Sequence, residues 1–314
     1  MKQIFLSTLT NLEEIQTYEP GSWINLVNPS QSESMEIAEH YGIDIADLRA
    51  PLDAEETSRV SVEDEYKLII VDVPILEERN NKTYYVTIPL GIILTEDAII
   101  TTSLQELPLI DHFLSQRQRN FFTFMRSRFV FQILYRNAGS YLTALRQIDR
   151  KSENVEKRLH ESTRNEELIE LMELGKTLVY FQASLKTNER VVKKLITSSR
   201  ILKKYEEDED LLEDTLIDTQ QALEMANIYG NILTGMSDAF ASIIANNQNI
   251  IMKTLALFTI LLEIPTMVFS AYGMNVLNSS IPLSENPFSF WIVIALSFGA
   301  TVPFIIYFIY KKWF

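Results

Sequence analysis

The sequence has no cysteine, few glycines and almost no proline in its middle. Without cysteine, the 314 residues form neither disulfides nor thiolate metal sites, which suits a reducing or indifferent compartment. No proline occurs between Pro108 and Pro265, so nothing in that stretch forces a helix to end. The chain is therefore expected to contain long helices and no covalent cross-links.

Basic residues are fewer than acidic ones, and the sequence has no common enzyme motif. The net charge is −14 at pH 7, so the chain lacks the basic surface with which proteins bind nucleic acids. Residues 253–314 hold three lysines and two glutamates, which leaves −15 on residues 1–252. His40, His112 and His160 do not have the spacing of metal ligands, and no phosphate-binding loop, nucleophile elbow or metalloprotease motif occurs. The sequence predicts neither an enzyme nor a nucleic-acid partner, whereas an acidic surface suits divalent cations.

Residues 1–125 have the pattern of a mixed α/β domain. A helix is expected at about 31–41, ended by Gly42, and a second short helix at 43–48. Runs rich in Ile, Val, Tyr and Thr predict three strands, with residues 77–82 separating the first two: Tyr66–Val73, Thr83–Leu94 and Ala98–Thr102. The short connections favour antiparallel pairing, with the helices packed on the sheet.

From about residue 126 onward, the chain is expected to be mostly helical. Apolar residues at helical spacing predict an antiparallel pair of helices at 126–162 and 165–203. The acidic run Glu206–Glu209 is expected to start a third helix, which continues without a strong break to Ala271.

One stretch is apolar and long enough to cross a membrane. Residues 255–271 include only four polar residues, Thr259, Glu263, Thr266 and Ser270, which are spaced by 4, 3 and 4 positions. This spacing places them in one stripe along a helix. The stripe must be shielded from lipid, because an ionisable group in hydrocarbon is costly. It therefore predicts either a seam between helices or the wall of a pore.

A second apolar run, residues 288–310, is expected to be a second span after a short loop. Lys253 flanks the first span, and Lys311 and Lys312 flank the second. Lysines at these ends predict that the N- and C-termini are cytoplasmic. The N-terminal apolar run is too short for a signal peptide, so residues 1–252 are expected to precede the membrane.

The first span ends in the tetrapeptide Tyr272-Gly273-Met274-Asn275, which a brief loop, the second span and a basic C-terminus follow. This combination resembles the CorA-type divalent metal (magnesium/cobalt) ion transporter family, the two-span channels with a GMN motif. The resemblance implies a funnel-shaped homopentamer in the plasma membrane, whose first span lines a central pore. Each subunit would have an α+β cytosolic N-terminal domain, made of a small sheet with helices, followed by long helices and two transmembrane helices.

The chain is expected to divide into four parts. These are a cytosolic α/β domain at 1–125, a cytosolic antiparallel helical pair at 126–205, the cytosolic stalk part of the long pore helix at 206–253 and a two-span transmembrane domain at 254–314. The spans of the last part are expected at 254–272 and 288–310, with an outer loop at 273–287.

Under this resemblance, Gly273, Met274 and Asn275 form the pore mouth. Mg²⁺ gives up its octahedral water shell reluctantly, so a selective mouth should offer neutral oxygens to the hydrated ion. Five copies of Asn275 would supply a ring of such oxygens. The alternative is that Gly273 and Asn275 only cap the helix.

Stepping backward along the stripe by three and four residues reaches Met252, Asn249 and Asp238. Met252 and Asn249 are expected to line the pore, with a second oxygen ring at Asn249. The resemblance also implies that Asp238 lies near an intersubunit metal site that senses cytosolic divalent metal. Glu77 or Glu78 is the candidate partner carboxylate, and the alternative for Asp238 is a solvated helix face.

Glu263 departs from the family pattern, in which an apolar or hydroxyl residue usually occupies the narrow middle of the pore. Five carboxylates facing the axis would attract divalent cations or share protons. The alternative is that Glu263 pairs with a polar group on a neighbouring helix.

These features together predict a channel for passive influx of divalent metal cations, Mg²⁺ first and Co²⁺ or Ni²⁺ next, gated by cytosolic divalent metal. The metal ion would be substrate and regulator, with no cofactor and no ATP, because a negative-inside potential drives a cation inward. The expected partners are divalent metal ions, further copies of the chain and the lipid bilayer. Two alternatives stay open: a zinc transporter of the same fold, and a membrane-anchored cytosolic scaffold or signalling protein.

Overall fold

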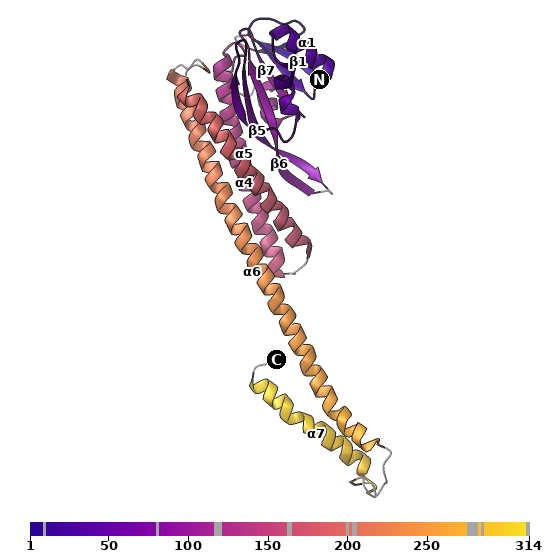
Figure 1. Cartoon of the computed structure of the whole chain (residues 1–314). Coiled ribbons are helices and arrows are strands. Elements are labelled where there is room, and N and C mark those ends of the chain that lie inside the picture. The colour runs from indigo at the N-terminus through magenta and orange to yellow at the C-terminus, as the bar shows by residue number, and fades with distance from the viewer. Residues whose placement is uncertain are drawn as a thin grey trace. The chain divides into compact units, whose positions relative to one another are not determined.

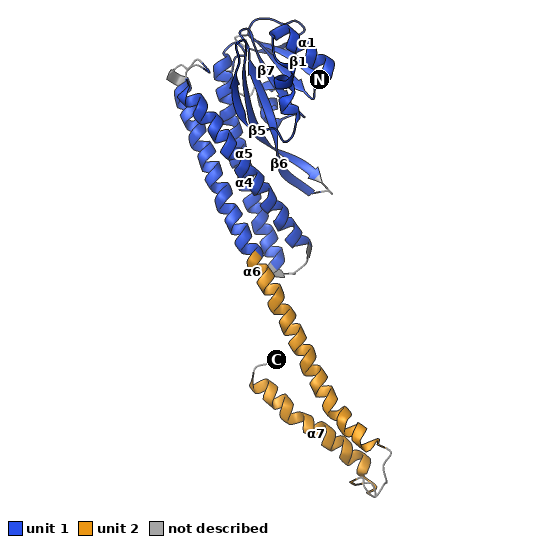
Figure 2. Ribbon diagram, in the orientation of Figure 1, with its two compact units in different colours: residues 1–237 blue, residues 238–314 orange. Residues whose placement is uncertain are grey.

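The computed structural model describes residues 1–8, 11–79, 82–115, 121–161, 165–198, 201–202, 206–274, 282–283 and 286–311. The chain divides into two compact units, residues 1–237 and residues 238–314 (Figure 2). One helix, α6 (Glu206–Tyr272), contributes to both units.

A seven-stranded sheet forms the centre of the first unit (Figure 1). Its strands are β1 (Lys2–Ser7), β2 (Leu12–Ile15), β3 (Ser22–Val27), β4 (Arg59–Val62), β5 (Lys67–Arg79), β6 (Lys82–Leu94) and β7 (Ala98–Ser103). Their order in the sheet is β2-β1-β3-β7-β6-β5-β4. Strands β3 and β7 are parallel, and the other neighbours are antiparallel. The antiparallel pairing expected for β5, β6 and β7 is confirmed.

The sheet differs from the prediction at two places. Strands β1, β2, β3 and β4 were not predicted, because they are short and β3, buried along nearly its whole length, lacks the alternation of a half-buried strand. The predicted break at residues 77–82 is wrong, since both strands extend into it and Glu77 and Glu78 pair with Tyr84 and Thr83. The described side chains there are exposed or half-buried, so no hydrophobic pattern marks this part of the strands.

Helices cover both faces of the sheet. The short ones are α1 (Gln31–Tyr41), α2 (Ile45–Arg49), a 3-10 helix (Ala50–Leu52) and α3 (Pro108–Leu114). Successive residues of β5 point to opposite faces, so Leu68 and Ile70 join a core with α1 and α2, whereas Ile69 and Val71 join a core with α3 and the long helix α4. Each fully buried side chain of this size contributes about 1.5–3 kcal/mol, so the sheet is stabilised from both sides.

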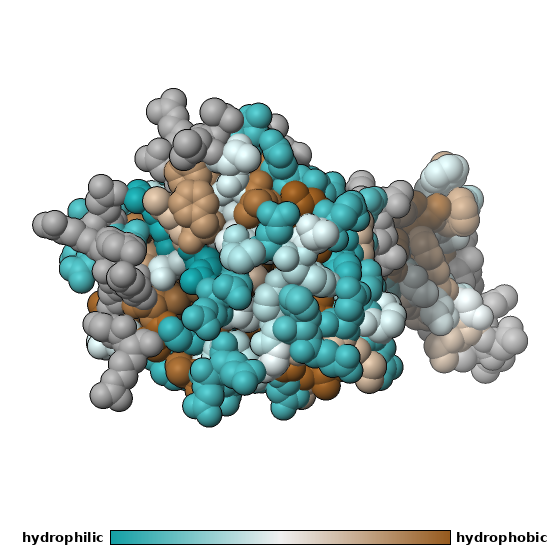
Figure 3. Space-filling model, turned by 90° about the horizontal axis from the view of Figure 1, so that it is seen from above, coloured by the Kyte–Doolittle hydropathy of each residue, from teal (hydrophilic) through white to brown (hydrophobic). Residues whose placement is uncertain are grey.

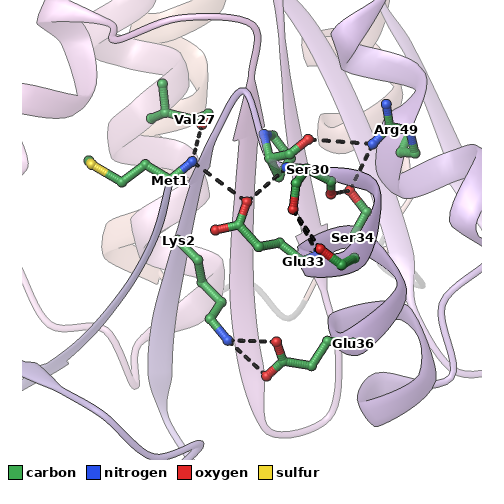
Figure 4. A network of polar contacts seen from close by, with 10 residues as sticks. Met1, Lys2, Val27, Ser30, Glu33, Ser34, Glu36 and Arg49 are labelled. Atoms are coloured by element: carbon green, nitrogen blue, oxygen red, sulfur yellow. Dashed lines mark hydrogen bonds and ion pairs between the residues drawn. The ribbon is translucent and has the colours of Figure 1, made fainter.

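Helix α1 forms at its predicted bounds and is fixed at both ends. Ser30 Oγ accepts a hydrogen bond from the backbone N–H of Glu33, and the Glu33 carboxylate accepts one from the N–H of Ser30, which is a capping box. Gly42, at a φ of 66°, ends the helix. Lys2 Nζ lies 2.8 Å from a Glu36 carboxylate oxygen and ties β1 to α1 (Figure 4).

The long helices follow in chain order: α4 (Arg126–Glu161), α5 (Asn165–Thr197), α6 (Glu206–Tyr272) and α7 (Ser289–Tyr310). The predicted helical pair and the third helix that starts in the acidic run are confirmed. Helix α5 stops short of the expected residue 203, because the chain turns there and buries Ile201 and Leu202 in the core. From above, the first unit shows a mainly hydrophilic surface with small hydrophobic patches (Figure 3).

Asp72 of β5 is a largely buried carboxyl group between the sheet and helices α4 and α5. Its backbone carbonyl accepts hydrogen bonds from Asn137 Nδ2 at 2.8 Å and Asn188 Nδ2 at 2.9 Å, so both helices are anchored on it. Burial raises the pKa of Asp72, and hydrogen bonds from the hydroxyls of Ser184 and Ser58 partly oppose this shift.

This raised pKa predicts that Asp72→Asn stabilises the protein at neutral pH. A protonated Asp72 favours the folded state, and that contribution is complete below the usual aspartate pKa of 3.8 and is lost as the pH rises through the folded-state pKa. Asn keeps the shape without the charge, so the apparent melting temperature at pH 7 should rise by about 2–4 °C and converge with wild type toward pH 4. Thermal unfolding of the full-length protein in detergent measures this, with the exposed Asp64→Asn as control. A lower melting temperature for Asp72→Asn at pH 7 would contradict the prediction.

Candidate functional site

Two described helices are long and apolar enough to cross a membrane: a stretch of α6 that ends at Tyr272, and α7. Large apolar side chains are exposed along both, including Leu262 (69 %), Met267 (69 %) and Ile306 (62 %). A surface of this kind is stable in lipid or against another chain rather than in water. The first predicted span, 254–272, is the C-terminal part of α6, and the second, 288–310, corresponds to α7.

The predicted polar stripe lies on the open surface of α6. Thr259, Glu263, Thr266 and Ser270 are all exposed in the single chain. The hydroxyls of Thr259 and Thr266 each donate to the carbonyl oxygen four residues earlier, at 2.9 Å and 2.8 Å. These hydroxyls are therefore satisfied by their own helix and need no partner from α7.

The opposite face of α6 is the one that packs within the second unit. Leu257 is only 1 % exposed, and Leu261, Ile264 and Val268 are half-buried. With 3.6 residues per turn, this face lies about 160° from the polar stripe. The buried residues of α7 are Val293, Ser297, Thr301 and Phe308. Packing between α6 and α7 thus covers the apolar face and leaves the stripe uncovered.

Gly273 ends α6 at the predicted pore mouth. Its N–H donates to the carbonyl oxygens of Phe269 at 2.9 Å and Ser270 at 3.2 Å. A Cβ at this position would lie 3.3 Å from the Phe269 oxygen, so glycine permits the tight helix end. Met274 is 59 % exposed. Asn275, the predicted source of the oxygen ring, lies outside the described residues.

The remaining predicted site residues belong to different units. Asn249, Met252 and Asp238 are exposed on the part of α6 that lies in the second unit. Glu77 is half-buried and Glu78 is exposed, both on β5 of the first unit. Within the described part of the chain, no three His, Asp or Glu side chains come together as metal ligands.

Glu170 of α5 is a charged residue that the sequence analysis missed. Its side chain is 10 % exposed and is surrounded by Arg158 Nη2 at 2.9 Å, Lys82 Nζ at 3.4 Å and Lys151 Nζ at 3.8 Å. A signal for it is present in the sequence, because Glu170 precedes the buried Leu174 by four residues and so falls on the buried face of the helix. A carboxylate on that face must find cationic partners.

Comparison with known proteins agrees with the resemblance drawn from the tetrapeptide. The chain matches the family described as CorA-like Mg2+ transporter protein over residues 19–312. It is 30 % identical over 295 residues to the cobalt/magnesium transport protein CorA of Methanocaldococcus jannaschii, covering 93 % of this chain and 90 % of that protein. The complete structure of the CorA magnesium transporter from Methanocaldococcus jannaschii superposes with a TM-score of 0.82 at 27 % identity, over 100 % of this chain and 99 % of that chain.

Two further solved structures share the fold. The full-length CmaX protein has a TM-score of 0.71 at 15 % identity, over 99 % of this chain and 96 % of that one. The ZntB cytoplasmic domain from Vibrio parahaemolyticus has a TM-score of 0.60 at 12 % identity, over 79 % of this chain and 97 % of that one. At these identities the likeness concerns the fold alone. Since the family match spans both candidate transmembrane helices and nearly all of the first unit, the chain belongs to the CorA family of divalent-cation transporters, whose members are ion channels or transporters and not enzymes.

Proposed function

We propose that five copies of this chain form a channel for the passive influx of divalent cations, with Mg²⁺ as the preferred ion. The observation that carries the proposal is the polar stripe of α6, which is exposed on the face opposite to α7. A carboxylate at the centre of a span costs about 2.5–3.5 kcal/mol when it faces lipid, and more by some estimates. A water-filled axis between identical copies removes that cost for Glu263.

The stripe would offer oxygen ligands along the axis. Thr259, Thr266 and Ser270 supply hydroxyl oxygens and Glu263 supplies carboxylates. Mg²⁺ keeps most of its water shell, so these groups would hydrogen-bond to a hydrated ion rather than replace its ligands. A negative-inside membrane potential would then drive the ion inward without ATP.

Two further rings would bound this path. At the outer end, Gly273 ends the helix so that Met274 and Asn275 form the mouth, with Asn275 as the oxygen ring. At the inner end, Asn249 and Met252 continue the line of the stripe. Both termini would then be cytoplasmic, in a plasma-membrane protein.

Cytosolic divalent metal would close the channel. The metal would bind between subunits near Asp238, with Glu77 or Glu78 as the partner carboxylate. Residues 1–252 carry a net charge of −15, so five copies repel one another when the metal leaves. That repulsion would loosen the assembly and open the pore.

Ion flux into proteoliposomes tests the proposed function, with Mg²⁺, Zn²⁺, Co²⁺ and Ni²⁺ offered separately. Mg²⁺ influx that depends on the membrane potential is expected. Flux of Zn²⁺ alone would favour the zinc transporter, and flux of none of the four ions would favour the anchored scaffold.

The assembly is predicted to be a homopentamer in mild detergent. The exposed polar stripe cannot face lipid, so each chain needs neighbours on that side. Native mass spectrometry of the full-length protein measures the number of copies. A sample that is mainly monomer or dimer would rule out the pore hypothesis.

Asn275→Ala is predicted to abolish most of the uptake and to leave assembly intact. The change removes the acceptor ring but little apolar packing, and losing hydrogen bonds to a charged ion should lower Mg²⁺ flux by roughly tenfold or more. Flux and native mass are measured on the same preparation. Normal flux in a pentameric Asn275→Ala protein would mean that Gly273 and Asn275 only cap the helix.

Glu263→Gln is predicted to weaken the competition between divalent cations in the pore. Gln keeps the shape and the hydrogen bonds but removes five negative charges, so the Co²⁺ concentration that half-inhibits Mg²⁺ uptake should rise severalfold. Thr254→Val, on the half-buried face of α6, is the control and should leave this value unchanged. If Glu263→Gln also leaves it unchanged, Glu263 is a structural partner between helices.

A further inference from the structure

The outer ends of β5 and β6 extend beyond the rest of the sheet (Figure 1). The outer arm is defined here as residues 76–79 of β5 and 82–87 of β6. Its described side chains are exposed or half-buried, with Leu76 56 % exposed, and the continuous core begins only at Ile75 and Ile88. The inner part of the arm is held by Val86, which packs on the core, and by Tyr85, which contacts the Phe181 ring and hydrogen-bonds to Gln147 and Thr177. The outer part, residues 76–79 and 82–84, buries little apolar surface, so its position depends on polar contacts with its neighbours.

Glu170 joins the outer arm to both neighbouring helices. Lys82, the first residue of β6, approaches a Glu170 oxygen from the outer arm. Arg158 and Lys151 approach from α4, and Glu170 itself belongs to α5. Three cations thus share one carboxylate whose side chain is 10 % exposed. A buried carboxylate of this kind is stable only while its partners stay in place.

Lys151 makes a second set of contacts, directly with the outer arm. Its Nζ donates to the backbone carbonyl of Thr83 at 2.9 Å and lies 4.9 Å from the centre of the Tyr84 ring. Thr83 and Tyr84 are the cross-strand partners of Glu78 and Glu77. Lys151 therefore holds the backbone directly opposite the two glutamates.

We propose that Glu170, Lys82, Lys151 and Arg158 form an ionic latch that holds the outer arm on α4 and α5 and fixes the position of Glu77 and Glu78. These latch residues are positioning residues, since they act on the cation through the two glutamates. The regulatory part of this inference rests on the proposed closure of the channel by cytosolic metal. With the latch closed, the glutamates are pre-organised for a divalent cation, which raises affinity because the outer arm is already ordered.

The charges of the latch residues predict how strongly each substitution loosens the outer arm. Glu170→Gln leaves three cations without their common carboxylate, so they repel one another and loosen the outer part of the arm, while the contacts of Tyr85 and Val86 remain. Lys151→Met removes the backbone contact and one ion pair, whereas Lys151→Arg keeps the charge and the donors. Lys82→Met removes a half-exposed partner and should have the smallest effect.

Hydrogen exchange of the full-length protein in nanodiscs tests the latch itself. Glu170→Gln should speed amide exchange in the outer arm by on the order of tenfold, because hydrogen bonds to charged groups are worth that much or more. Glu173→Gln is the matched control, since it removes the same charge from the same helix, where Glu173 forms an ion pair with the exposed Lys176. Unchanged outer-arm exchange in both Glu170→Gln and Lys151→Met overturns the latch.

Inhibition by cytosolic Mg²⁺ tests its regulatory role. In proteoliposomes, Glu170→Gln and Lys151→Met should raise the Mg²⁺ concentration that half-inhibits flux severalfold, while Lys151→Arg and Glu173→Gln keep the wild-type value. Faster outer-arm exchange with unchanged Mg²⁺ inhibition overturns the regulatory role. If wild-type flux ignores cytosolic Mg²⁺, the proposed gating has failed, and the exchange measurement still decides the latch.

Discussion

A carboxylate that faces hydrocarbon is costly in free energy, and the membrane part of this protein is arranged around that constraint. Helix α6 separates its two kinds of side chain onto opposite faces, with Leu257 and its neighbours toward α7 and Glu263 away from it. In a single chain, only the apolar face of α6 is covered, by α7. The polar face is left for a partner that can solvate it, and identical copies around water are the simplest such partner.

Much of the helical architecture could be predicted from the sequence, because its signals are local. Gly42 and the Ser30 capping box mark the ends of α1, and both operate within one helical turn. The lack of proline before Pro265 allowed α6 to be predicted as one helix. The spacing of Thr259, Glu263 and Thr266 similarly determined their common face, since helical periodicity requires no knowledge of the rest of the fold.

Features that depend on distant contacts could not be predicted in this way. Strand β3 pairs with β7 across some seventy residues of chain, and its nearly continuous burial shows only once the sheet is assembled. Lys82 and Glu170 are 88 positions apart, so no spacing rule links them. Glu77 and Glu78 looked like a turn because their half-exposed strand buries few apolar residues. The ligands that a second copy would contribute to Asp238 are beyond any single-chain pattern.

The bonding of the threonine hydroxyls determines what the face of α6 can offer to an ion. The hydroxyl groups of Thr259 and Thr266 each donate their one hydrogen to a backbone carbonyl oxygen of the same helix. What these side chains turn outward is therefore an oxygen with free lone pairs, and an ionised Glu263 adds lone pairs of the same kind. In the proposed pore, waters around a cation would direct both of their hydrogens outward to acceptors on these three residues, whereas waters around an anion already donate one hydrogen to the anion and would gain less from them. In that pore, discrimination by the sign of the charge would thus begin with the internal hydrogen bonds of a helix.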